Sequence, residues 1–156
     1  MRKLLVPICA LALSACASTM SAPTSPDGGM MRVKSAHSAK VTMDRFEAAV
    51  KAKSMNVFAR IDHAAGAQRV SKTLRPTEVL IWGNPQSGTP LMECAQTVGI
   101  DLPQKTLVWQ DAGGDVYVGY NDPAHLMQRH GGYGCDALVA NVRNALAGFA
   151  KEATQP

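Results

Sequence analysis

Acidic, amide and imidazole side chains stand where the predicted strands end, and these residues could do chemistry. Asp62 is the last residue of one predicted strand, and His63 follows it. A histidine beside a carboxylate can act as a general base or contact a ligand. The same two residues could instead have only a structural role, in a turn or at a helix cap. The sequence therefore leaves a functional site and a structural turn both open for this pair.

A second polar group follows two further predicted strands. Its members are Asn84, Thr89, Tyr120, Asn121 and Asp122. Polar side chains at strand ends are available to a ligand, because crevices form there. Asn84 and Asp122 each precede a proline, which is also a common capping pattern. We expect the loops around Gly83 and Tyr120 to converge on one candidate ligand-binding pocket at the same edge of the sheet, and a contribution from His63 would strengthen that expectation.

Metal and cofactor chemistry has little support in the sequence. His125 and His130 are five residues apart on a predicted helix, a rotation of about 500°, so they do not share a face as i, i+4 zinc ligands do. A site that combines His63 with one of them stays open. Residues 83–88 lack the Lys-Ser or Lys-Thr of a phosphate loop, and the chain has no nucleophile elbow. The sequence predicts no metal and no cofactor.

The N-terminus has the pattern of a bacterial lipoprotein signal. Arg2 and Lys3 precede a ten-residue apolar run, which is too short to span a membrane. The following Leu13-Ser14-Ala15-Cys16 resembles a lipobox, and this resemblance implies cleavage before Cys16 and attachment of acyl groups such as palmitate to it. Two or more acyl chains hold a protein stably on a bilayer. An ordinary signal peptide with an incidental cysteine is the alternative. Ala17, where an aspartate would favour the inner membrane, favours a periplasm-facing location on the outer membrane.

Cleavage of the leader removes Cys9, and lipidation occupies Cys16, which leaves Cys94 and Cys135 in the mature domain. An oxidising envelope permits a disulfide between them. Closing the loop would be worth roughly 4 kcal/mol by chain entropy. Two separate buried thiols and a redox pair are the alternatives, although the chain has no Cys-x-x-Cys spacing.

The composition is that of one globular domain on a short tether. A chain of 156 residues suits a single domain, and 46% hydrophobic with 18% charged residues excludes a largely disordered chain. Residues 16–29 are mostly small, polar, proline or glycine, so we expect a disordered tether there. The net charge of +4 falls by two when Arg2 and Lys3 leave with the leader. The remaining basic residues are scattered, so nucleic-acid binding is not expected.

Hydrophobic periodicity predicts a sheet with helices packed on it. The central strand, residues 79–82, is wholly apolar and is expected to be buried on both faces. The predicted strands are 31–35, 56–62, 79–82, 105–110 and 116–120, and the predicted helices are 43–53, 90–97, one from Pro123, and 136–151. Thr42 and Thr89 are the expected caps of the first two helices. The predicted fold class is α+β, a small two-layer domain with an antiparallel-rich, mixed sheet of about five strands.

Several short motifs, in order, resemble the bacterial and archaeal domain-of-unknown-function family 302. They are DHAAGA at 62–67, LRPT at 74–77, GNP at 83–85, GTPLM at 88–92, GIDLP at 99–103 and YNDP at 120–123. The resemblance covers roughly residues 40–131 and implies a small α+β fold that tends to dimerise and has no established reaction. The predicted organisation is a signal at 1–15, the tether at 16–29, the family domain at 30–131 and an additional C-terminal helix within 132–156.

Three function classes follow from these observations. We favour an envelope lipoprotein whose domain, as a homodimer, binds a small molecule or a protein partner without catalysis. The first alternative is an enzyme that uses Asp62, His63 or Asp122 for acid–base chemistry. The second is a structural or assembly factor of the cell envelope, which a broad exposed apolar patch would favour.

Overall fold

A five-stranded antiparallel sheet forms the centre of the computed structural model, which describes residues 28–156. The spatial order of the strands is β1-β5-β4-β3-β2. Their bounds are β1 Met30–Ser35, β2 Asn56–Asp62, β3 Thr77–Gly83, β4 Gln104–Gln110 and β5 Val116–Asn121. The α+β prediction is confirmed, and every strand pair is antiparallel. The predicted signal, Cys16 and almost all of the tether lie outside the described residues.

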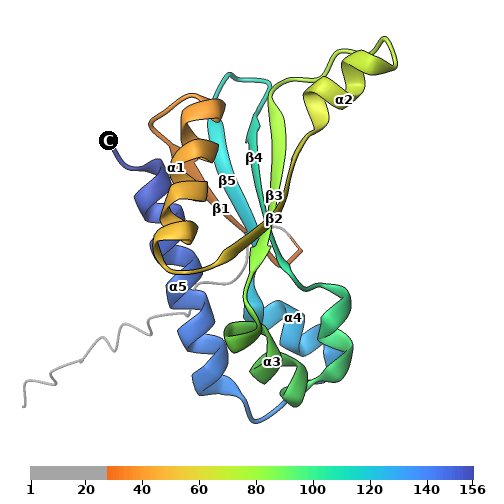
Figure 1. Cartoon of the computed structure of the whole chain (residues 1–156), viewed down its shortest axis with the longest axis vertical. Helices are drawn as coiled ribbons and strands as arrows, with labels where there is room; N and C mark the ends of the chain where they lie inside the picture. The colour runs from red at the N-terminus through yellow and green to blue at the C-terminus, as the bar shows by residue number, and fades with distance from the viewer. Residues whose placement is uncertain (1–27) are drawn as a thin grey trace, which may run out of the picture.

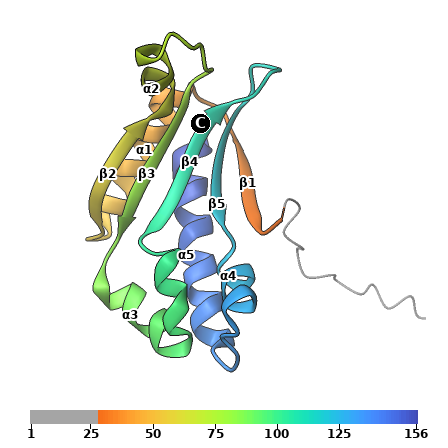
Figure 2. The same ribbon diagram turned by 90° about the vertical axis from the view of Figure 1, so that its right-hand side faces the viewer.

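Helices cover one face of the sheet and gather at one end of it. Their bounds are α1 Ala39–Ala52, α2 His63–Arg69, α3 Pro85–Cys94, the 3-10 helix η1 Gln96–Ile100, α4 Pro123–His130 and α5 Asp136–Thr154. The long helices α1 and α5 lie behind the sheet in Figure 2, which looks onto the face without helices. Figure 1 shows α3 and α4 at the lower end of the sheet and α2 at the opposite end. None of the helices in residues 28–156 has a stretch long and apolar enough to cross a bilayer.

The main core lies between the sheet and the pair α1 and α5. Phe46, Trp82 and Phe149 meet edge to face there, with ring centroids 5.2–6.2 Å apart. The buried Trp82 satisfies its indole N–H by donating to the Thr106 hydroxyl at 3.0 Å. Such aromatic contacts add to the free energy gained from burial, so this cluster fixes α1 and α5 on the sheet.

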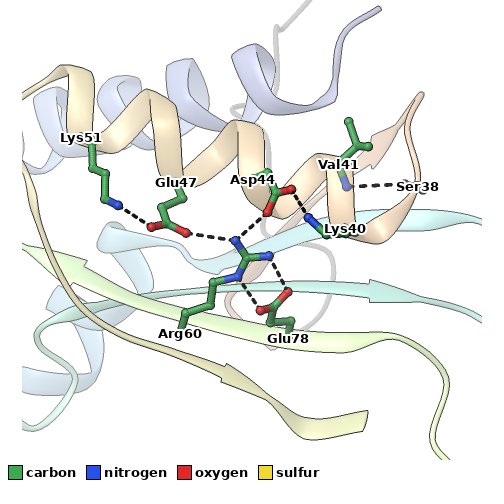
Figure 3. Close-up of polar contacts among 8 residues, drawn as sticks. All are labelled: Ser38, Lys40, Val41, Asp44, Glu47, Lys51, Arg60 and Glu78. Atoms are coloured by element: carbon green, nitrogen blue, oxygen red, sulfur yellow. Dashed lines mark hydrogen bonds and ion pairs between the residues drawn. The ribbon is translucent and has the colours of Figure 1, made fainter. Parts of the chain in front are cut away.

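Arg60 attaches α1 to the sheet through a shared set of ion pairs (Figure 3). From β2, its Nη1 donates to Asp44 at 2.7 Å and to Glu47 at 3.0 Å on α1, and it also pairs with Glu78 of β3. Hydrogen bonds from Lys40 and then from Arg60 lower the pKa of Asp44. Lys51 and then Arg60 lower the pKa of Glu47 in the same way. The carboxylates therefore stay ionised, and one guanidinium connects three elements.

A second, smaller core lies below the sheet. It contains Leu91, Val98, Leu126, Met127 and Val139, which come from α3, η1, α4 and α5. A disulfide joins Cys94, the last residue of α3, to Cys135, which precedes α5, with the two Cα atoms 6.5 Å apart. The disulfide therefore holds α3 against the start of α5.

Two predicted helix starts were wrong because other residues cap these helices. Ser38 caps α1 by accepting from the Val41 N–H, so the helix begins four residues before the expected start. Thr42 is instead buried in the first turn, where its hydroxyl shares a hydrogen bond with Ser35. Near position 90, Asn84 is the cap and accepts the Ser87 N–H at 2.9 Å. Proline fits the first helical position, which Pro85 occupies, and Pro90 then lies inside α3.

The expected burial of the central strand on both faces was also wrong. Leu80 and Trp82 of β3 are buried under the helices, whereas Val79 and Ile81 point to the opposite face and are only half-buried. Residues 79–82 are all apolar because the two faces of the strand differ: one face packs under the helices, and the other carries apolar side chains with no helix layer above them.

Candidate functional site

An apolar cavity of about 550 Å³ opens between α3, the lower end of β3 and α5. Its apolar walls include Trp82, Leu91, Met92, Leu102, Leu138 and Val142. Leu138 and Val142 are four residues apart on α5 and therefore lie on one face of that helix. Gly83 and the capped turn at Asn84 redirect the chain from β3 into α3, which forms the opposite wall. The cavity exists because α3 packs beside α5 below the end of the sheet.

Polar side chains in this cavity are few and uncharged. Asn84 is occupied by its capping role, since its carbonyl oxygen accepts from both the amide and the hydroxyl of Ser87. Thr89 also lines the cavity and is exposed. The side-chain amides of Gln104 and Asn141 reach the cavity and make no hydrogen bond with any described residue. These two amides are available to a polar group of a ligand.

A smaller cavity of about 270 Å³ lies on the other flank of α5, and its character is different. Asp122, whose side chain is 6% exposed, forms an ion pair with Arg143 of α5, and its Oδ1 lies 2.9 Å from Arg143 Nε. Its carboxylate also caps α4 by accepting the Ala124 N–H at 3.1 Å. Tyr120 lines the same cavity, and burial, followed by the negative charge of Asp122, raises its pKa, while Arg143 opposes this. This cavity therefore contains a charged pair beside a protonated phenol.

A wider groove of about 660 Å³ continues from the smaller cavity along β1 and the last turns of α5. The two share Met31, Tyr120 and Ala147. Small residues on this side of α5 leave the space open, because alanine side chains do not reach the edge strand β1.

The structure separates the candidate residues that we expected to converge. Asn84 and Thr89 line the apolar cavity, whereas Tyr120 and Asp122 line the charged one. Both loops do lie at the same end of the sheet, but different faces of α5 complete the two cavities: Leu138 and Val142 line the apolar one, and Ala140 and Arg143 line the charged one. Asn121 lines neither cavity.

Asp62 and His63 lie at the opposite end of the sheet from both cavities. Asp62 caps α2 by accepting the Ala65 N–H at 2.8 Å, and His63 is the exposed first residue of that helix. The two residues therefore take the turn-and-cap role, and the fold does not bring them near Asp122. His130, one of the two further histidines, bonds to Asp101 at 2.7 Å and Thr97 at 3.0 Å, which attaches α4 to η1. Among the described residues, no three His, Cys, Asp or Glu side chains form a group suited to a metal ion.

Sequence reasoning missed Arg143, which completes the charged cavity. The available signal was a lone arginine in the middle of an otherwise apolar and small-residue helix, at a position three residues before the stripe residue Leu146. An arginine there must reach solvent or a carboxylate. Only the tertiary structure shows that the carboxylate is Asp122.

The family model described as "Domain of unknown function DUF302" matches residues 31–153. The chain belongs to the DUF302 family. The match extends past residue 131, the boundary that the motif resemblance suggested, and includes α5, so the helix that divides the two cavities lies within the matched region.

A solved structure confirms the fold. An uncharacterised DUF302 protein from Bacillus stearothermophilus superposes with a TM-score of 0.72 at 21% identity, over 80% of this chain and 98% of that one. Sequence relatives occur in Brucella. Over 104 residues, 67% of this chain, it is 49% identical to "Fluoride-specific ion channel FluC 1" of Brucella suis and to "Fluoride-specific ion channel FluC 2" of Brucella melitensis. The chain spans only 41% and 38% of those proteins.

Proposed function

We propose that this DUF302 domain binds an apolar or amphipathic small molecule in the cavity between α3 and α5. The observation that carries the proposal is the lining of that cavity, which is apolar apart from a few neutral polar groups. Its volume of about 550 Å³ is within the range of small-molecule sites, which are mostly hydrophobic with a few placed polar groups. The free amides of Gln104 and Asn141 would orient the polar end of such a ligand.

Binding without catalysis is the function that this lining favours. None of the described residues that line the apolar cavity is an aspartate, glutamate, histidine, lysine, arginine, cysteine or tyrosine. General acid–base catalysis needs such a group within hydrogen-bond reach of the substrate, and a hydroxyl nucleophile such as Ser87 or Thr89 needs an adjacent general base to activate it. A ligand in this cavity would therefore be held rather than transformed.

A location in the bacterial envelope, with Cys16 as the lipid-carrying residue, is part of the same proposal. The lipobox-like sequence supports it, and so does the Cys94–Cys135 disulfide, because such bonds persist in oxidising compartments. In the Brucella relatives the matched segment is part of a longer protein named as a channel. Because the chain spans only 41% and 38% of those proteins, the function in their names is not carried over to it.

A homodimer through the uncovered face of the sheet is also proposed. Trp109 and Tyr117 stack there with centroids 5.5 Å apart, and Arg32 lies over Tyr117 at 5.3 Å. Half-buried Val79, Ile81 and Leu107 extend this face across β3 and β4. A second copy would bury apolar surface that the helices do not cover.

Light scattering should report a dimer for the wild-type chain. Leu107→Glu should dissociate this dimer, and the control Ala48→Glu on α1 should not. A monomeric wild-type chain would overturn this assignment.

The binding proposal is tested by native mass spectrometry of the chain purified from its own cell envelope. We expect a retained small molecule in the wild-type chain, and its loss in Ala145→Phe, because Ala145 lines the cavity on α5 and the larger ring would fill it. Ala137→Phe is the matched control, since Ala137 is exposed on the same helix outside the cavity. A wild-type chain without ligand, or equal retention in Ala145→Phe, would contradict the proposal.

The lipid anchor is tested separately. Radiolabelled palmitate should enter the wild-type chain, and Cys16→Ser should abolish both the labelling and the membrane association of the mature chain. Continued membrane binding of Cys16→Ser would show that another feature holds the protein there.

A further inference from the structure

We propose that the charged cavity on the other flank of α5 is a second binding site, which takes a small monocarboxylate on Tyr120 and Arg143. This site shares no lining residue with the apolar cavity, so it does not depend on the function proposed for that cavity. Three observations support it: a phenol hydroxyl that makes no hydrogen bond with a described residue and is open to solvent at the cavity, a guanidinium whose Nη atoms make no hydrogen bond with a described residue, and a cavity of limited size.

The first observation is the hydroxyl of Tyr120. The residue is 4% exposed, and within the described residues its hydroxyl makes no hydrogen bond. The hydroxyl oxygen is not one of the buried unsatisfied atoms of residues 28–156, so it is open to water, which a ligand oxygen could replace. Tyr120 lines both the small cavity and the adjoining groove, which is where a partner could reach it. Because its pKa is raised, the phenol stays protonated near neutral pH and can donate to an anion.

The second observation is the way Arg143 is held. Its Nε forms an ion pair with Asp122, and Asp122 is itself fixed by burial and by its role as the cap of α4. No hydrogen bond from Nη1 or Nη2 to a described residue accompanies this contact, although the side chain is only 31% exposed. A guanidinium has five donors in a planar fork, and the Nη edge fits the two oxygens of a carboxylate. Asp122 therefore orients an arginine whose outer edge is available for a ligand.

The third observation concerns charge and size. The Asp122–Arg143 pair is neutral overall, so a single added negative charge is tolerated, while a second would be repelled by the buried Asp122 carboxylate. The remaining walls are small or apolar, namely Met31, Pro123, Ala140 and Ala147. A volume of about 270 Å³ holds a short carbon skeleton. The site therefore fits an acid of a few carbon atoms, with its carboxylate between Tyr120 and Arg143.

Saturation-transfer difference NMR with propionate as the probe tests this proposal on the whole chain in detergent micelles. We expect saturable binding of propionate and none of the neutral analogue propionamide. Tyr120→Phe and Arg143→Lys should each weaken binding about tenfold, the effect of losing one hydrogen bond to a charged group. Tyr120→Phe removes only an oxygen that makes no hydrogen bond with a described residue, so this variant should fold normally.

Matched controls make the same chemical changes away from the cavity. Tyr133→Phe alters a tyrosine that is 83% exposed, and Arg69→Lys alters an exposed arginine on α2. Both should bind propionate as the wild-type chain does. Absence of saturable propionate binding in the wild-type chain, or unchanged affinity in Tyr120→Phe, would overturn the proposal, and neither result would bear on the apolar cavity.

Discussion

The two cavities on either side of α5 differ in chemistry although one helix supplies a wall to both. Leu138, Val142 and Ala145 face the apolar cavity, while Ala140 and Arg143 face the charged one. The residues of each set are three or four positions apart, which places them on one face of α5, and the two sets occupy different faces of that helix. Val142 and Arg143 are therefore neighbours in the sequence, yet Val142 lines the neutral cavity and Arg143 lines the charged one.

The cavities also differ in what holds them together. Below the sheet, the Cys94–Cys135 disulfide fixes α3 to the start of α5, so a covalent bond maintains the apolar cavity. The charged cavity has the Asp122–Arg143 ion pair between the start of α4 and the middle of α5. We therefore expect reduction of the disulfide to perturb the apolar cavity, and loss of the ion pair to perturb the charged cavity.

The largest expected effect is loss of the disulfide. Cys94→Ala with Cys135→Ala opens a loop defined by a sequence separation of 41, and chain entropy then predicts a loss of about 4 kcal/mol in the free energy of unfolding. Urea denaturation monitored by Trp fluorescence measures this loss. Native mass spectrometry should also show less ligand retained in the apolar cavity, while propionate binding persists. Equal loss at both cavities would mean that they unfold as one unit.

Removal of the arginine is the second-largest expected effect. Arg143→Met removes the ion pair that Arg143 makes with the mostly buried Asp122 carboxylate, and the free energy of unfolding should fall by about 3 kcal/mol, the lower end for buried pairs because Arg143 is partly exposed. Asp122→Asn in the same chain removes the carboxylate charge and keeps a capping side chain, so it should restore part of the loss. A double-variant cycle by urea denaturation gives the coupling. Additive losses would show that the pair does not act as a unit.

Much of the fold could be predicted from the sequence, because its signals are local. Alternation within residues 116–120 reflects a sheet with one helix-covered face, and the caps Asp62 and Asp122 act within three residues of themselves. In residues 56–62 a register shift between Val57 and Ala59 places these two side chains on different faces, although the sequence alternation predicts one face. The errors also have local causes. Thr42 and Thr89 are competent caps, but Ser38 and Asn84 precede them and begin the helices earlier.

The candidate site was less predictable, because its parts meet only in three dimensions. The sequence does place Asn84 and Tyr120 at one end of the sheet, yet it does not show that they line separate cavities on different faces of α5. Arg143 is 21 positions from Asp122, with no local pattern that links the two residues. Pairings of this kind depend on how α4 and α5 pack, which the periodicity of either helix leaves undetermined.

A smaller effect distinguishes the lining of the apolar cavity from the core beside it. Leu138→Ala should lower the free energy of unfolding by about 1.5 kcal/mol, because the half-buried side chain already borders empty space. Leu146→Ala is the comparison, since that side chain is 1% exposed in the main core and should cost 2–5 kcal/mol, roughly the usual range for buried leucine. Urea denaturation of both variants measures the difference. Equal losses would indicate that the cavity is closed in solution.

The smallest expected effect is that of Tyr120→Phe. Its hydroxyl makes no hydrogen bond with a described residue and is open to solvent, so removing it should change the free energy of unfolding by less than about 1 kcal/mol at neutral pH. Its pH dependence is distinctive, because burial and Asp122 raise the pKa of Tyr120 in the folded chain above the ordinary value of 10.0. Below that value both states are protonated and the contribution of Tyr120 is complete. As the pH rises further, the unfolded state releases the proton first, so stability is lost as the pH rises through the folded pKa.

Urea denaturation across this alkaline range should show a shallower decline for Tyr120→Phe than for the wild-type chain, with the exposed Tyr133→Phe as control. Parallel declines for all three chains would mean that the phenol is solvated, and the charged cavity would then be as open to water as the surface around it.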